Sequence, residues 1–177
     1  MEYYHLIKIE LLSEANFSLE SLDSYNRKQN ANKVYRKING EYTIVECKYT
    51  EDWDLNKKRS VAKQISSDDC ISYIALENEK VVGFIGLLKK LNGPYMILDM
   101  MQVYSECRGK GVGRQLFEAG KAEARKAGAE ALYISACSSE ETIAFYRAMG
   151  SDLASNPLKE MVEAEPFDLQ MICPVKD

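Results

Sequence analysis

The chain has 177 residues, of which 46% are hydrophobic, which suffices for one ordinary core and leaves no room for two comfortable domains. Its 23 Lys and Arg residues and 27 Asp and Glu residues give a net charge of -4, which argues against a nucleic-acid-binding protein. No apolar run approaches the roughly 18 to 20 residues that cross a membrane, and no signal-peptide pattern opens the chain. We therefore expect one cytoplasmic domain over residues 1–177.

The first half of the chain carries weak structural patterns. Alternating apolar and polar residues over 3–12 predict a first strand. The polar stretch 13–38 is expected to hold only short helical or irregular pieces, and 42–47 predicts a short strand. Within 52–65 a helix is expected, with Asp54 as a candidate N-cap.

The second half has sharper patterns and indicates a mixed α/β order. An apolar stripe over 112–127 predicts a helix that Gly128 ends. Ser138 and Glu141 have the spacing of a capping box, which predicts a second helix that runs to Met149. Apolar runs bounded by turn residues predict strands at 71–76, 80–88, 95–103, 132–137 and 167–173.

The cysteines and histidines exclude several kinds of site. The five cysteines are an odd number without a C-x-x-C pair, which fits neither a disulfide framework nor a zinc site, so no metal is expected. Cys70, Cys137 and Cys173 lie in apolar runs, where a small buried side chain is the simplest interpretation. Since His5 is the only histidine, sites that need two imidazoles are excluded.

A glycine cluster between the strand 95–103 and the helix 112–127 carries the clearest chemical signal. A helix start leaves backbone N–H groups without partners at the positive end of the dipole, and glycines let a ligand approach them. Three cations beside the glycines favour an anion, most naturally a diphosphate, although a tight structural turn with incidental surface cations stays open. The glycines are Gly109, Gly111 and Gly113, and the cations are Arg108, Lys110 and Arg114.

Two common phosphate loops do not fit this cluster. A Walker A loop needs a Gly-Lys pair followed by Ser or Thr, and the chain has none. A dinucleotide-binding fingerprint has the spacing G-x-G-x-x-G with an acid about 20 residues later. Here the spacing is G-x-G-x-G, and no carboxylate lies near Tyr133.

The sequence resembles the GNAT superfamily of N-acetyltransferases. Residues 108–113, Arg-Gly-Lys-Gly-Val-Gly, match the family pattern Q/R-x-x-G-x-G/A, and 142–150 resembles the family's later helix with its tyrosine and terminal glycine. The resemblance covers about 71–150. It departs from the family at Ser139, where asparagine is common, and at Ser151, where an aromatic residue is usual.

The resemblance implies a fold and a cofactor. The fold is a single domain with a mixed sheet of about six or seven strands flanked by helices and two splayed parallel strands at the cofactor cleft. The acyl donor is acetyl-coenzyme A, held in a core of about 71–150, with acceptor-specificity elements in about 13–65 and 151–177. Its implied contacts are Met101, Gln102, Val103, Arg108, Gly109, Lys110, Gly111, Val112, Gly113, Arg114, Ser139 and Phe145.

Catalytic roles also follow from the resemblance. A backbone N–H near Met101 would polarise the thioester carbonyl. Tyr146 would protonate the departing thiolate; the alternative, a buried core tyrosine without a catalytic role, stays open. A lysine-like amine is neutral about once in 2,500 molecules at pH 7, so a base is useful. Asp99 is the candidate; a water chain or a purely structural role for this acid stays open. Glu46 and Glu51 are weaker candidates for the base. The acidic run Glu160, Glu163 and Glu165 could attract a cationic acceptor, although a solvated surface is the simpler interpretation.

The acceptor itself stays open. Aminoglycosides, streptothricin-like amines, polyamines, amino acids and protein N-termini all fit the resemblance. The acidic balance mildly favours a small cationic amine and indicates nothing stronger. The reaction that the resemblance implies is direct attack of the amine on the thioester in a ternary complex. A sensor that binds acyl-coenzyme A without turnover and a protein or peptide N-acetyltransferase are the alternatives. A homodimer also stays open.

Overall fold

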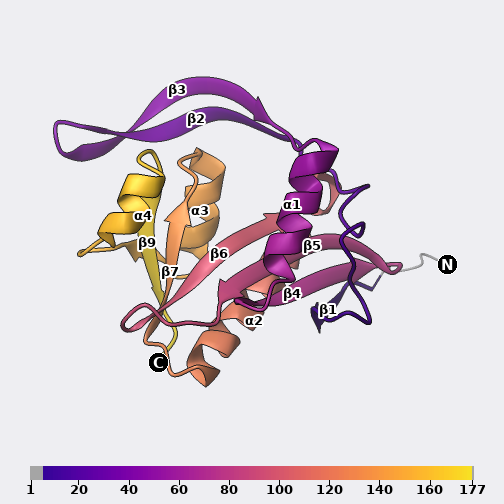
Figure 1. The fold of residues 1–177 in the computed structure, drawn as a ribbon. Helices are drawn as coiled ribbons and strands as arrows, with labels where there is room; N and C mark the ends of the chain where they lie inside the picture. The colour runs from indigo at the N-terminus through magenta and orange to yellow at the C-terminus, as the bar shows by residue number, and fades with distance from the viewer. Residues whose placement is uncertain (1–5, 177) are drawn as a thin grey trace.

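The computed structural model describes residues 6–176 and is built around a seven-stranded mixed sheet (Figure 1). The strand order is β1-β4-β5-β6-β7-β9-β8, with β6 and β7 parallel and every other neighbouring pair antiparallel. This confirms the expected fold class and the parallel pair. The strands are β1 (Lys8–Leu11), β4 (Cys70–Glu77), β5 (Lys80–Leu88), β6 (Tyr95–Val103), β7 (Ala131–Ala136), β8 (Asp152–Leu153) and β9 (Leu169–Pro174).

Helices cover both faces of the sheet because its central strands are apolar on both sides. On one face Ile74 and Phe84 pack with α1, and on the other Ala75 and Ile85 pack with α2 and α3. No helix within residues 6–176 has both the length and the apolar character to cross a membrane. The helices are α1 (Leu55–Ile65), α2 (Val112–Lys126), α3 (Glu140–Ala148) and the short α4 (Lys159–Ala164), with a 3-10 turn at Ser105–Cys107.

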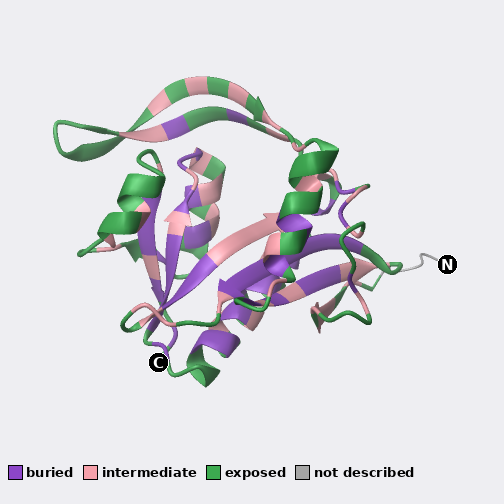
Figure 2. Ribbon diagram, in the orientation of Figure 1, coloured by how far each residue is buried: buried purple, intermediate pink, exposed green. Residues whose placement is uncertain are grey.

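A second, two-stranded sheet stands apart from the main one. Strands β2 (Gln29–Ile38) and β3 (Glu41–Glu51) form a long hairpin that arches from the α1 side toward α3 (Figure 1). Asn39 and Gly40 form its tight turn, with φ angles of 51° and 84°. Much of the hairpin is exposed (Figure 2). The prediction of short irregular pieces over 13–38 is therefore wrong for its second half.

Other boundaries confirm or correct the sequence predictions. Asp54 caps α1, accepting a hydrogen bond from the Lys57 N–H at 2.8 Å, as predicted. The cap of α3 is Ser139, one residue after the predicted Ser138. Strand β1 is shorter than the first strand predicted over 3–12. Residues 3–5 of that prediction, His5 included, lie outside the described residues.

Candidate functional site

The parallel strands β6 and β7 part halfway along their length. Their pairing ends at Leu98 opposite Ile134, so the edge of β6 beyond that point has no ladder partner on the β7 side. A cleft of about 770 Å³ opens there, lined by Met101, Gln102 and Val103 among others. A hollow of similar volume, about 810 Å³, lies beside β1 and contains none of the predicted site residues.

The glycine loop forms one end of this cleft. Gly109 and Gly111 have φ angles of 75° and 80°, a left-handed conformation that favours glycine, and a Cβ at either position would meet no atom within 4 Å. Gly111 caps α2 without a side-chain hydrogen bond, so the first N–H groups of the helix are not capped by it. The loop thus presents backbone donors and open space, which suits an anionic group.

The third glycine of the loop, Gly113, is needed for close packing and not for a left-handed backbone. A Cβ on Gly113 would lie 3.0 Å from a ring atom of Phe145 and 3.6 Å from Val103. Gly113 therefore lets the start of α2 approach α3 closely. Both Gly113 and Phe145 line the cleft.

The three cations of the loop are disposed differently from one another. The Arg108 guanidinium donates to the backbone carbonyls of Val103 and Lys28, both at 3.2 Å, and of Arg27 at 3.5 Å. Its side chain thereby ties the loop to the segment that leads into β2. Arg114 is exposed and lines the cleft, whereas Lys110 is exposed and does not line it.

Two more predicted contact residues do not line the cleft. Val112, the first residue of α2, has its side chain buried in the core. Ser139 is fully buried; its hydroxyl accepts from the Thr142 N–H at 3.3 Å and donates to the Thr142 Oγ1 at 2.7 Å. Its side chain therefore acts as a helix cap, and Val112 can face the cleft only through its backbone.

Tyr146 lines the same cleft from α3. The side chain is buried and packs against Phe117 and Phe145, with ring centroids 6.0 and 5.3 Å away. Burial raises the pKa of Tyr146 above its usual value, and the nearby Cys137 thiol and Asp168 carboxyl add to the effect. The hydroxyl is thus kept protonated at neutral and mildly alkaline pH.

Asp99 reaches the cleft because β6 has a bulge. Gly86 of β5 pairs with Met100, and the next residue of β5 pairs with Leu98, so Asp99 is the extra residue. Its side chain is half-buried, lines the cleft and accepts a hydrogen bond from Gln64. Among residues 6–176 no ion pair involves Asp99, so the alternative of a carboxylate neutralised by Lys or Arg is not observed.

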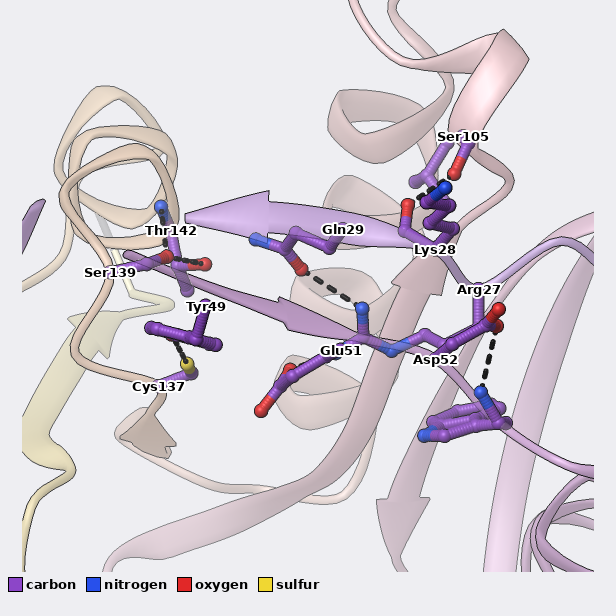
Figure 3. A network of polar contacts seen from close by, with 12 residues as sticks. Arg27, Lys28, Gln29, Tyr49, Glu51, Asp52, Ser105, Cys137, Ser139 and Thr142 are labelled. Atoms are coloured by element: carbon purple, nitrogen blue, oxygen red, sulfur yellow. Dashed lines mark hydrogen bonds and ion pairs between the residues drawn. The ribbon is translucent and has the colours of Figure 1, made fainter. Parts of the chain in front are cut away.

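The cleft is also lined by residues far from the glycine loop in sequence. Arg27 and Gln29 lie near the start of β2 and Glu51 ends β3 (Figure 3). The buried Arg27 guanidinium contacts the Glu51 carboxylate at 2.6 Å and donates to Gln29 Oε1 at 3.0 Å. Of the acids named from sequence as weaker candidates, Glu51 and Glu165 line the cleft, and Glu46, Glu160 and Glu163 do not.

Asp168 lines the cleft but is not among the site residues predicted from the sequence. It follows Pro166 and precedes β9, and no motif marks it. Ser135 donates to its Oδ2 at 3.0 Å. Burial raises the pKa of Asp168, and the carboxylates of Glu165 and Glu51 raise it further, whereas the hydrogen bond from Ser135 acts in the opposite direction.

The hairpin is fastened to the segment that precedes α3. The Tyr35 N–H donates to the Ser138 carbonyl at 2.8 Å, and the Arg36 guanidinium donates to the Ser138 hydroxyl at 2.7 Å. Closer to the cleft, the Tyr49 hydroxyl lies 3.7 Å from the Cys137 sulfur (Figure 3). The end of the cleft that holds the acids is therefore bounded by the hairpin.

Comparison with solved structures shows the same fold. Nourseothricin acetyltransferase superposes with a TM-score of 0.74 at 18% identity, covering 96% of this chain and 99% of that one. A protein from Bacillus anthracis str. Ames assigned as a streptothricin acetyltransferase, solved with acetyl coenzyme A, gives 0.72 at 19%, covering 96% and 98%. The ribosomal-protein-S18-alanine N-acetyltransferase from Escherichia coli gives 0.61 at 15%, covering 97% and 96%.

Sequence comparison gives the family. No curated protein matches the chain by sequence search. The model of the Acetyltransferase (GNAT) family matches residues 29–150, more than half of the chain, and this match begins well before the resemblance recognised at 71–150. The chain therefore belongs to the GNAT family of acetyltransferases.

Proposed function

We propose that the protein transfers an acetyl group from acetyl-CoA to a small, positively charged amine by direct attack in a ternary complex. The observation that carries the proposal is one cleft that combines an uncapped glycine loop, a strand edge without a partner and two candidate catalytic side chains, Tyr146 and Asp99. The family supports the reaction class. Two solved relatives of the same fold hold acetyl coenzyme A or coenzyme A.

The loop fits the diphosphate of coenzyme A. Left-handed Gly109 and Gly111 leave open space over the backbone, and the N-terminus of α2 adds its dipole. Arg114 would add a positive charge at the mouth. The β6 edge at Met101 to Val103 would receive the pantetheine as an extra strand, because its backbone groups face no ladder partner on that side.

When bound, acetyl-CoA supplies the thioester that the amine attacks. A backbone N–H near Met101 would donate to the thioester oxygen as negative charge develops on it. Since burial raises the pKa of Tyr146, this residue is a weaker acid than an ordinary tyrosine, and a free thiol has a pKa of about 8.5. We therefore assign the hydroxyl a hydrogen bond to the leaving sulfur in place of the full proton transfer expected from sequence. Asp99 would take the proton that the amine loses.

The acceptor end of the cleft supports a small cationic amine. Glu165 and Asp168, from the segment 151–177 expected to set specificity, supply carboxylates that form no ion pair among residues 6–176. Glu51, from the segment 13–65, also lines the cleft, but its carboxylate is paired with Arg27. The hairpin across this end favours a compact acceptor over an extended peptide, because its backbone is fastened to Ser138.

A panel of amines tests the proposal through release of coenzyme A thiol. It should contain nourseothricin, an aminoglycoside, spermidine and a peptide with an N-terminal alanine, with acetyl-CoA as donor. The proposal predicts thiol release with a small cationic amine and formation of its acetylated product by mass spectrometry. Coenzyme A binding without acetylation of any amine would favour a sensor, and a preference for the peptide would favour a protein N-acetyltransferase.

A further inference from the structure

The candidate base Asp99 has a partner that comes from a different layer of the fold. The side-chain amide of Gln64, in the last turn of α1, donates from Nε2 to Asp99 Oδ2 over 2.5 Å. An ionised carboxylate offers only acceptors, so the amide must present its nitrogen. Because the amide is neutral, it restrains the carboxylate and leaves its charge in place. An ion pair with Lys or Arg would neutralise that charge.

Both partners are held by rigid elements. Next to Gln64, the buried Ile65 packs so closely on β5 that a Cβ on Gly86 would lie 3.2 Å from it. The Ile65 carbonyl also accepts a hydrogen bond from the Ser72 hydroxyl of β4 at 2.6 Å. Gly86 in turn pairs with Met100, directly after the bulge at Asp99. The end of α1 is thus anchored to the sheet at the point where the bulge turns Asp99 out of the ladder.

We propose that Gln64 is a positioning residue that fixes the Asp99 carboxylate for proton transfer from the acceptor amine. The inference rests on the proposed function. Gln64 does not itself line the cleft, so it acts through Asp99 and does not bind the acceptor. One carboxylate oxygen is occupied by the amide, and the remaining lone pairs stay available to the amine. Fixing a reacting group before the reaction is a common source of rate enhancement.

The test replaces the amide donor without changing the length of the side chain. Gln64→Met should lower kcat about tenfold, the loss expected for one hydrogen bond to a charged group, while the KM values for acetyl-CoA and for the best amine of the panel change less than about twofold. Lys63→Met is the matched control on the same helix turn, since Lys63 is exposed, and its kcat should be unchanged. If Gln64→Met does not fold, Gln64→Glu keeps the shape of the side chain, removes the amide donor and should lower kcat by at least the same factor.

A double-mutant cycle with Asp99→Asn separates the inference from the proposed function. If Gln64 acts through Asp99, Gln64→Met has no further effect on kcat in the Asp99→Asn background. An unchanged kcat in Asp99→Asn alone would refute the base, whereas a large loss in Asp99→Asn with none in Gln64→Met would overturn the role of Gln64 alone. A crystal structure of Gln64→Met gives a readout without turnover. A rotated or split Asp99 carboxylate supports the inference, and an unchanged one overturns it.

Discussion

Gly111→Ala should weaken coenzyme A binding far more than it weakens the fold. The backbone at Gly111 is left-handed with a φ of 80°, and an added Cβ meets no atom within 4 Å, so the variant suffers strain without a clash. For a non-glycine residue this left-handed conformation costs roughly 1–2 kcal/mol. Replacing glycine also reduces the conformational entropy of the unfolded chain, which offsets about 0.4–1 kcal/mol of that cost. The free energy of unfolding should therefore fall by about 1 kcal/mol, which lowers Tm by about 2–4 °C for a chain of this size.

Affinity should respond more strongly, because the new methyl group occupies the space proposed for the diphosphate. Losing one backbone hydrogen bond to a charged oxygen costs about 1.5–3 kcal/mol, so the Kd for coenzyme A should rise at least about tenfold. Gly128→Ala is the matched control: its φ is 81°, it also has no atom within 4 Å, and it lies beyond the other end of α2. Calorimetric titration with coenzyme A and thermal melts measure both effects. Equal affinities in the two variants would refute the assignment of the loop.

Three further outcomes follow from the cleft. Tyr146→Phe should lower kcat about tenfold through loss of one hydrogen bond to developing charge, with the KM for acetyl-CoA within about twofold; steady-state kinetics would contradict this role if both changed equally. Because burial raises the pKa of Tyr146, its hydroxyl stays protonated as the amine is neutralised, so kcat should not fall between about pH 8 and 10. A fall there in the wild type that is absent from Tyr146→Phe would contradict the raised pKa. Asp168→Asn should raise the KM for a cationic amine about tenfold and leave the KM for acetyl-CoA unchanged; an equal rise for both would place Asp168 outside the acceptor end.

The parts of the fold that the sequence predicts are those with one dominant physical cause. The continuous apolar runs of β4, β5 and β6 predict buried strands, and the apolar stripe of α2 predicts a helix on the sheet. Only part of the hairpin is predicted, namely the strand over 42–47, which lies within β3; the rest is not, because its strands bury few residues and so lack an apolar face. Its strongest sequence signal is the Asn39-Gly40 pair, which favours the two-residue turn that the structure contains.

The candidate site likewise has one part that the sequence predicts and another that it does not. The glycine loop is predictable because left-handed backbone at Gly109 and Gly111 is a local requirement that glycine satisfies. The acceptor end is not, because Glu51 and Asp168 belong to segments more than 100 residues apart that tertiary folding brings to one cleft. The contact between Gln64 and Asp99 likewise depends on the packing of α1 beside a bulge, which no local pattern specifies.

A crystal structure of the protein with coenzyme A would show where the diphosphate of the cofactor binds. We expect the diphosphate on the backbone N–H groups between Arg108 and Arg114, with the pantetheine along β6 where this strand parts from β7. Density for coenzyme A at another site, or a diphosphate held by side chains away from this loop, would contradict this expectation.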